Sequence, residues 1–219
     1  MIIDITQTTK IGRVYRAGSE PLKVEKVTRY SKSGSEYTTT SFSCDVHNMG
    51  THIDVMNPDV VIENERLIGE GIKFDVSHIP NKVIKLKDLD LSLIKEGVYV
   101  FFQTNWDQYF EDEEKYNNHP EISIEVIKYP VDKNVNIIGI DTFNIIGIDT
   151  FNIIGIDTLG LGVSKNHGII DKYLGDHKMY AIENLCNLKD IPNKNFKVYC
   201  LPMKIEGLDG YPTRILVEF

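Results

Sequence analysis

The sequence has only three cysteines among its 219 residues, and no two of them stand in a C-x-x-C spacing. An odd number of widely spaced thiols (Cys44, Cys186 and Cys200) excludes a disulfide framework and is typical of a reducing compartment. The N-terminus also lacks the basic segment and the long apolar segment of a secretory signal peptide. We therefore expect a cytoplasmic protein.

Positive charge is scarce as well. Lysine and arginine total 24 against 32 acidic residues, and the formal net charge is −8. The basic residues are scattered, which argues against the electrostatic footprint of a nucleic-acid-binding protein. No apolar run reaches the roughly 18 residues that a membrane-spanning helix needs. Neither a nucleic acid nor a membrane is an expected partner.

The remaining composition, 42% hydrophobic and 26% charged, is ordinary for a globular chain long enough to bury a core. Helices are expected over residues 90–95, 123–129 and 166–174, with Pro130 and Gly175 ending the last two. β-Strand patterns outnumber these helices, and they cover residues 1–6, 72–76, 82–86, 98–102, 179–183, 196–203 and 213–219, with a hairpin within 29–40. We predict a single α/β domain over residues 1–219, with strands in the majority.

A tandem repeat occupies residues 136–158. Residues 136–143 recur identically as residues 144–151, and a third copy starts at Asn152. The period of eight is too short for a solenoid unit. Because it is even, a slide by one copy keeps every side chain on its original face, so the pairing register is degenerate. We expect one copy to fill a central strand and the others to form a hairpin or a bulge; the alternative is a duplication without a functional role.

Metal-binding residue types gather in residues 47–54, which read HNMGTHID. His52 and Asp54 are two residues apart, so on a strand both side chains point to one face. An imidazole nitrogen and a carboxylate oxygen together suit Zn²⁺ or Mn²⁺. His167 and Glu183 lie far along the chain and could join them only through the fold. Taken singly, His52 could equally be a buried structural histidine, and Glu183 a surface carboxylate.

The order of these motifs resembles that of the cyclase family of metal-dependent hydrolases, which includes bacterial kynurenine formamidase and isatin hydrolase. The family signature is H-x-G-T-H-x-D-x-P-x-H, then G-I-D, then a histidine that opens a helix, then E-N-L-x-N-L. The chain matches it at residues 50–54, 155–158, 167 and 183–188. Of the three Gly-Ile-Asp-Thr copies, only the last lies at a family-like distance from His167. The likeness extends over nearly the whole chain apart from the extra repeat copies.

The resemblance implies a compact, β-rich α/β fold of the kynurenine formamidase (swivelling β/β/α) type, with metal ligands from both halves of the chain. By matching position it implies His52, Asp54, His167 and Glu183 as ligands of Zn²⁺ or Mn²⁺. The implied activity is hydrolysis of the C–N bond in a small amide or cyclic amide. The implied assembly is a homodimer or homotetramer.

The chain departs from the family pattern at the first and last positions of the signature. The first ligand falls on Asn48, so either the adjacent His47 turns into the site through a bulge or Asn48 offers its amide oxygen. The final histidine, the family's proton shuttle, is Pro58, and Asp59 is the nearby titratable substitute unless it is a solvated loop carboxylate. Loss of a general acid or base costs about 10² to 10⁴ in rate. A second hypothesis is therefore a catalytically degenerate member that acts as a binding or structural protein.

Overall fold

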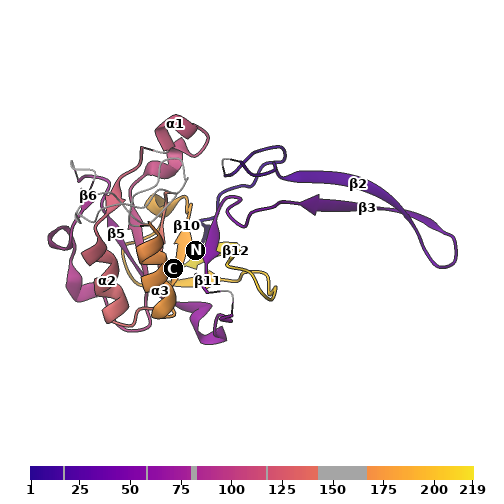
Figure 1. Ribbon diagram of the computed structural model, residues 1–219. Coiled ribbons are helices and arrows are strands. Elements are labelled where there is room, and N and C mark those ends of the chain that lie inside the picture. The colour runs from indigo at the N-terminus through magenta and orange to yellow at the C-terminus, as the bar shows by residue number, and fades with distance from the viewer. Residues whose placement is uncertain (17, 58, 80–82, 117, 143–166) are drawn as a thin grey trace.

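The computed structural model describes the chain except for residues 17, 58, 80–82, 117 and 143–166 (Figure 1). The main element is a nine-stranded mixed sheet with the strand order β1-β13-β11-β5-β7-β9-β10-β4-β12. Its strands are β1 (Ile2–Asp4), β4 (His52–Asp54), β5 (Ile68–Asp75), β7 (Tyr99–Gln103), β9 (Ile137–Ile140), β10 (Tyr180–Glu183), β11 (Phe196–Cys200), β12 (Gly210–Pro212) and β13 (Ile215–Glu218). The strand-dominated α/β class predicted from the sequence is confirmed.

The four central strands, β5, β7, β9 and β10, run parallel, and the strands on both sides of them pair antiparallel. All five residues of β7, from Tyr99 to Gln103, are buried. A strand covered on both faces reads as a continuous apolar run rather than an alternating one. That is why the YVFF segment predicts this strand so clearly.

Two hydrophobic cores lie on the two faces of this sheet. On one face, α2 (Ile124–Asp132) and α3 (His167–Asp176) lie side by side (Figure 1), and Val126 and Leu174 belong to the same hydrophobic core as Phe102. On the other face, Tyr99 and Phe101 pack against side chains from β4, β11 and β13. The short strand β4 thus belongs to the second core, through the fully buried Ile53.

The predicted end of α2 at Pro130 is wrong. Pro130 lies inside the helix, which continues to Asp132. Proline removes one backbone donor and costs most in a helix interior. Here it stands within the last turn, and its own carbonyl still accepts hydrogen bonds from Lys133 and Val135. The helix therefore tolerates it.

The predicted end of α3 at Gly175 is also wrong, because the helix continues to Asp176. The residue with positive φ is Lys178, at 51°, and the Met179 amide donates to the carbonyl of Leu174, 2.9 Å away. This is the Schellman arrangement that ends many helices, with lysine in place of the usual glycine. A Cβ on Gly175 would lie 3.3 Å from Met56 Cβ, so packing explains this glycine.

The first repeat copy fills a central strand, as predicted, because β9 lies between β7 and β10. A Cβ on Gly139 would lie only 2.8 Å from the Phe101 ring and 3.0 Å from Leu185. The close approach of these side chains explains the glycine of the repeat. Only the third copy lies at a family-like distance along the sequence from His167. In the structure, however, the first copy forms strand β9. The second and third copies lie outside the described residues.

A long hairpin, here named the hairpin arm, extends from the body of the molecule (Figure 1). It consists of β2 (Lys23–Tyr30) and β3 (Glu36–Ser43), which pair antiparallel over eight residues. The predicted hairpin is confirmed, and it is longer at both ends than residues 29–40. The side chains of Tyr30 and Phe42 are 66% and 63% exposed. The arm thus presents apolar surface away from either core.

The remaining elements are short. The helix expected over 90–95 is a single 3-10 turn, η3. The other short elements are β6 (Val83–Ile84), β8 (Glu121–Ile122), α1 (Glu113–Tyr116) and the 3-10 turns η1 (Asn64–Arg66), η2 (Leu86–Asp88), η3 (Leu91–Leu93), η4 (Trp106–Tyr109) and η5 (Leu188–Asp190). In the described part of the chain, no helix has the length and apolar character needed to cross a membrane.

Candidate metal centre

The pairing of β4 brings together groups that are far apart in the sequence. β4 lies between β10 and β12, with His52 opposite Glu183 on one side and opposite Pro212 on the other. His52 and Asp54 share a face of the strand, and Ile53 points into the core, as the two-residue period requires. Both site residues of β4 are buried, and so is Glu183.

Four predicted ligand residues converge at this point. His47 Nε2 lies 3.0 Å from Asp54 Oδ1, and His52 Nε2 lies 3.4 Å from the same oxygen. His52 Nε2 is also 3.6 Å from Glu183 Oε2. Ligand atoms of His47, His52 and Asp54 all lie within 4.8 Å of one another. We call these three residues together with Glu183 the metal cluster.

The backbone before β4 explains how both His47 and Asn48 reach the cluster. On a regular strand, adjacent side chains point to opposite faces. Here the Met49 amide donates to the His47 carbonyl and the Gly50 amide to the Asn48 carbonyl, so the chain bends tightly twice. Gly50 has φ +90°, which favours glycine. His47 therefore turns towards Asp54 while Asn48 Nδ2 lies 3.3 Å from His52 Nε2.

The tautomer of His52 is set by the backbone. Its Nδ1 lies 2.9 Å from the Gly50 carbonyl oxygen, which can only accept, so Nδ1 carries the proton and donates it. In the neutral ring, the lone pair is then on Nε2, which faces the two carboxylates. A second interaction holds this carbonyl in place, because Asn184 Nδ2 donates to Gly50 O over 3.1 Å.

The carboxylates and imidazoles of the cluster stabilise each other's charged forms. Burial by itself lowers the pKa of His52, but the carboxylates of Asp54 and Glu183 raise it well above the usual value. Burial by itself raises the pKa of Asp54, but the imidazoles of His52 and His47 hold it well below the usual range. A positive charge among them would stabilise two carboxylates that lie around one imidazole nitrogen. A proton on His52 or a divalent ion would supply it.

The donor set fits a divalent ion. Imidazole nitrogens and carboxylate oxygens are ligands that Zn²⁺ accepts, and Mn²⁺ takes carboxylates readily. One further atom supports the fit: the amide oxygen of Asn48 is buried and accepts no hydrogen bond. Buried polar oxygens are normally satisfied, and an ion or its bound water would satisfy this one.

The structure leaves two predicted site residues untested. His167 is the first residue of α3, and its side chain lies outside the described residues. Asp59 is exposed, and its backbone amide donates to the Asn57 side chain over 3.1 Å. The ligand role of His167 and the catalytic role of Asp59 stay predictions.

Sequence reasoning missed Asp209 and Gly210, which precede and open β12. Asp209 Oδ1 lies 3.0 Å from His47 Nδ1, and a Cβ on Gly210 would lie 2.7 Å from the His47 ring. No spacing rule links these residues to His47, because 162 positions separate Asp209 from it along the chain. The family resemblance extends over this part of the chain as well, but it gave no role to Asp209.

The repeat contributes a buried aspartate close by, at the end of β9. The carboxylate of Asp141 accepts hydrogen bonds from the Thr104 amide, the Thr104 hydroxyl and the Asn105 amide, at 2.6–3.0 Å. Burial raises its pKa to about 7 despite these donors. The loop after β7 thus supplies the hydrogen-bond donors to this carboxylate, which gives Asp141 a structural role.

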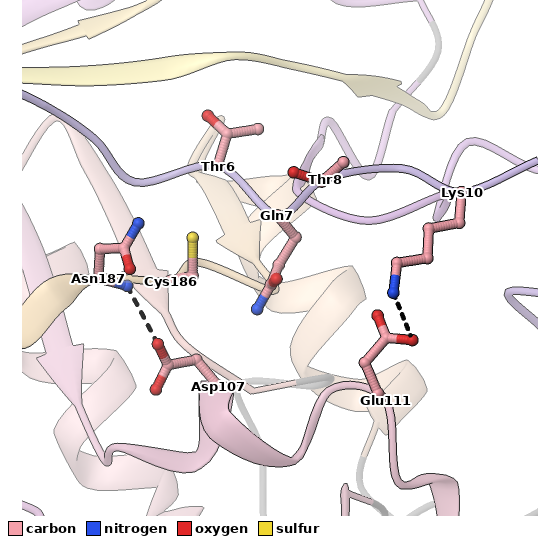
Figure 2. A pocket seen from close by; sticks show the side chains of 8 residues that line it. All are labelled: Thr6, Gln7, Thr8, Lys10, Asp107, Glu111, Cys186 and Asn187. Carbon is pink, nitrogen blue, oxygen red and sulfur yellow. Dashed lines mark hydrogen bonds and ion pairs between the residues drawn. The ribbon is translucent and has the colours of Figure 1, made fainter.

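A polar pocket of about 390 Å³ lies beside the first strand, outside the metal cluster (Figure 2). It contains an ion pair between Lys10 and Glu111 at 3.0 Å, and Asp107 accepts a hydrogen bond from the Asn187 amide. Cys186 also lines it, but burial and the surrounding carboxylates raise the pKa of this thiol to about 12. A thiol that stays protonated is a poor nucleophile, so Cys186 does not give this pocket a nucleophile.

The solved structures most useful for comparison cover almost all of this chain. Isatin hydrolase A from Ralstonia solanacearum is 21% identical, with a TM-score of 0.76 over 99% of this chain and 91% of that one. Isatin hydrolase A from Labrenzia aggregata, bound to benzyl benzoate, is 19% identical, with a TM-score of 0.77 over 99% and 93%. A predicted metal-dependent hydrolase from Bacillus stearothermophilus is 23% identical, with a TM-score of 0.66 over 99% and 97%.

These TM-scores establish a shared fold. No curated protein matches the chain. The family described as "Putative cyclase" matches residues 3–145, which is more than half of the sequence and includes His47, His52 and Asp54. The chain therefore belongs to the cyclase family.

Proposed function

We propose that the protein is a divalent-metal hydrolase that cleaves the C–N bond of a small amide or cyclic amide. The observation that carries the proposal is the metal cluster, in which His47 and Asp54 approach within 3.0 Å and His52 stands between two buried carboxylates. The isatin hydrolases among the structural neighbours support the substrate class.

The proposed ligands are of two kinds, neutral and negatively charged. His47 and His52 offer neutral nitrogens, and Asp54 and Glu183 offer negative oxygens; we propose that His167 completes the set. The ion is Zn²⁺ or Mn²⁺, and when bound it would polarise the substrate carbonyl and lower the pKa of a bound water. The burial of the cluster excludes bulk solvent, which strengthens each electrostatic interaction within it.

A proton must also pass to the leaving nitrogen. We propose Asp59 for this transfer, because it follows Pro58, which stands where the resemblance places a histidine and cannot titrate. Asp59 lies on an exposed turn, so substrate binding would have to bring it near the reacting bond. We expect Asp59→Asn to lower kcat by about 10² or more, the typical contribution of a general acid or base, with little effect on KM.

The second candidate function is that of a degenerate family member that binds an ion or a ligand without turnover. The specific observation in its favour is the same combination of Pro58 and an exposed Asp59. In that case the protein would bind metal normally yet leave every amide intact.

Metal analysis and an activity panel separate the two functions. Purified protein should hold metal that His52→Ala removes and that His78→Ala leaves in place, since His78 is exposed and is not one of the cluster residues. Metal-loaded protein should then hydrolyse at least one of isatin, aryl formamides and other cyclic amides. Metal without turnover favours the degenerate reading, and metal content unaffected by His52→Ala rules out both metal-based readings.

We also propose a homodimer or homotetramer built on the hairpin arm, with a second copy of this chain as its partner. An isolated two-stranded hairpin is marginally stable in water. This arm pairs over eight residues with its side chains largely exposed. Val24 lies opposite Phe42, and Tyr30 shares their face at the far end of the strand. An interface on this face would cover the apolar groups.

A further inference from the structure

We infer that Asp209 is a positioning residue that holds His47 in the tautomer needed for metal binding, and that Gly210 makes room for the ring. The inference deepens the proposed function and rests on it. The two nitrogens of His47 face two different carboxylates: Nδ1 is 3.0 Å from Asp209 Oδ1, and Nε2 is 3.0 Å from Asp54 Oδ1.

The two carboxylates differ in their surroundings. The side chain of Asp209 is 71% exposed, whereas that of Asp54 is 12% exposed. Asp54 lies inside the cluster with His52, and Asp209 lies at its rim. A neutral imidazole has one N–H, and a carboxylate partner at one nitrogen directs the lone pair to the other. Asp209 thus holds the proton on Nδ1, and Nε2 is directed towards the ion.

The backbone fixes Asp209 in this position. The Val55 amide, which follows β4, donates to the Asp209 carbonyl over 2.9 Å. The next residue, Gly210, pairs with Asp54 across the sheet. The backbone of Asp209 is therefore held at a fixed place relative to β4. This backbone, and not the contact with His47 alone, keeps the carboxylate near the ring.

Gly210 supplies the space for the ring. A Cβ at this position would lie 2.7 Å from both Cδ2 and Nε2 of His47, a distance that real Cβ atoms do not show. Because β12 is paired with β4, the backbone of Gly210 cannot move away without breaking that pairing. Any larger residue would displace the imidazole and, with it, the nitrogen that faces Asp54.

The test measures the affinity of the purified protein for Zn²⁺ alone, by competition with a chromogenic chelator. Asp209→Ala should weaken binding by about 10- to 100-fold, the usual effect of removing the partner of a metal-bound histidine. Asp209→Asn keeps an oxygen that can accept from Nδ1 and should recover part of the loss. Gly210→Ala should approach the loss caused by His47→Ala. Glu206→Gln, an exposed carboxylate of the same loop, is the matched control and should bind as the unchanged protein does.

A second readout separates metal positioning from loss of fold. Co²⁺ in place of Zn²⁺ should give a visible spectrum that changes in Asp209→Ala, while the thermal midpoint of the metal-free variant should match that of Glu206→Gln. Unchanged Zn²⁺ affinity in Asp209→Ala, together with loss of binding in His52→Ala, would overturn the positioning role alone. Unchanged affinity in His52→Ala would overturn the metal site itself.

Discussion

His52 and Glu183 stand directly opposite each other on the antiparallel strands β4 and β10, with Nε2 3.6 Å from Oε2. Residues 131 positions apart in the sequence thereby share one buried site. This pairing is a property of the sheet, so a change at Glu183 can alter the chemistry while the strand remains in place.

We expect Glu183→Gln to lower Zn²⁺ affinity by at least about 10- to 100-fold, since losing a direct ligand costs no less than losing a partner of one. Gln has nearly the same shape, so β10 should stay paired. The thermal shift on adding Zn²⁺ reports the loss, because a ligand at 100 times its Kd stabilises by about 2.7 kcal/mol. Lys189→Gln, beyond the end of β10, is the control. A full thermal shift in Glu183→Gln would mean that this carboxylate does not bind the ion.

Metal-free protein should be most stable in mildly acidic solution. The pKa of His52 is raised by folding, so its contribution is fully present below about pH 6.5 and is lost as the pH rises through the raised value. The pKa of Asp54 is lowered, so its contribution is present above about pH 4 and is lost as the pH falls through the lowered value. Both contributions are complete only between these limits.

Thermal unfolding of chelator-treated protein between pH 3 and pH 9 measures this dependence. In His52→Gln, the decline on the alkaline side of the window should become shallower, because the titrating imidazole is gone. An unchanged alkaline limb in that variant would show that some other group controls it.

Gly139→Ala should destabilise the protein by about 1–3 kcal/mol, the usual cost of overpacking a core. The added methyl would lie 2.8 Å from Phe101 and 3.0 Å from Leu185. Gly147→Ala is a matched control because its neighbours in sequence are identical. Urea unfolding of the two variants measures the difference, and a larger loss in Gly147→Ala would assign the strand to the second copy.

Phe42→Glu on the hairpin arm should dissociate the proposed oligomer. Phe42 pairs with Val24 and is 63% exposed, so a charge there disrupts a shared apolar face without opening a core. Ser43→Glu places the same charge on the opposite face and is the control. Light scattering coupled to size-exclusion chromatography gives the mass of each. A monomeric unchanged protein, or one whose mass survives Phe42→Glu, would argue against an interface on this face.

The sequence predicted the parts of the structure that local pattern encodes. The strands predicted at 98–102 and 179–183 follow from the pattern of neighbouring residues. Their predicted bounds differ by only one residue from those of β7 and β10. The helix ends were misplaced for different reasons. Pro130 is tolerated in a last turn, and Gly175 is small because Met56 packs on it, which only the tertiary structure shows.

The candidate site shows the same division. The two-residue spacing of His52 and Asp54 predicted their shared face. The choice between His47 and Asn48 stayed open because it depends on two tight bends, and these bring both side chains to His52. Asp209 was out of reach of any pattern, because its contact with His47 depends on the pairing of β4 with β12.

The position of β12 has a consequence for how the centre is assembled during synthesis. β4 is an early segment, but the strands on its two sides, β10 and β12, come from the last fifth of the chain. A ribosome must therefore have synthesised the chain through β12 before both of these strands can pair with β4 beside His52. We expect the ion to bind only after β12 has been synthesised, and a chain truncated before Gly210 should not retain it.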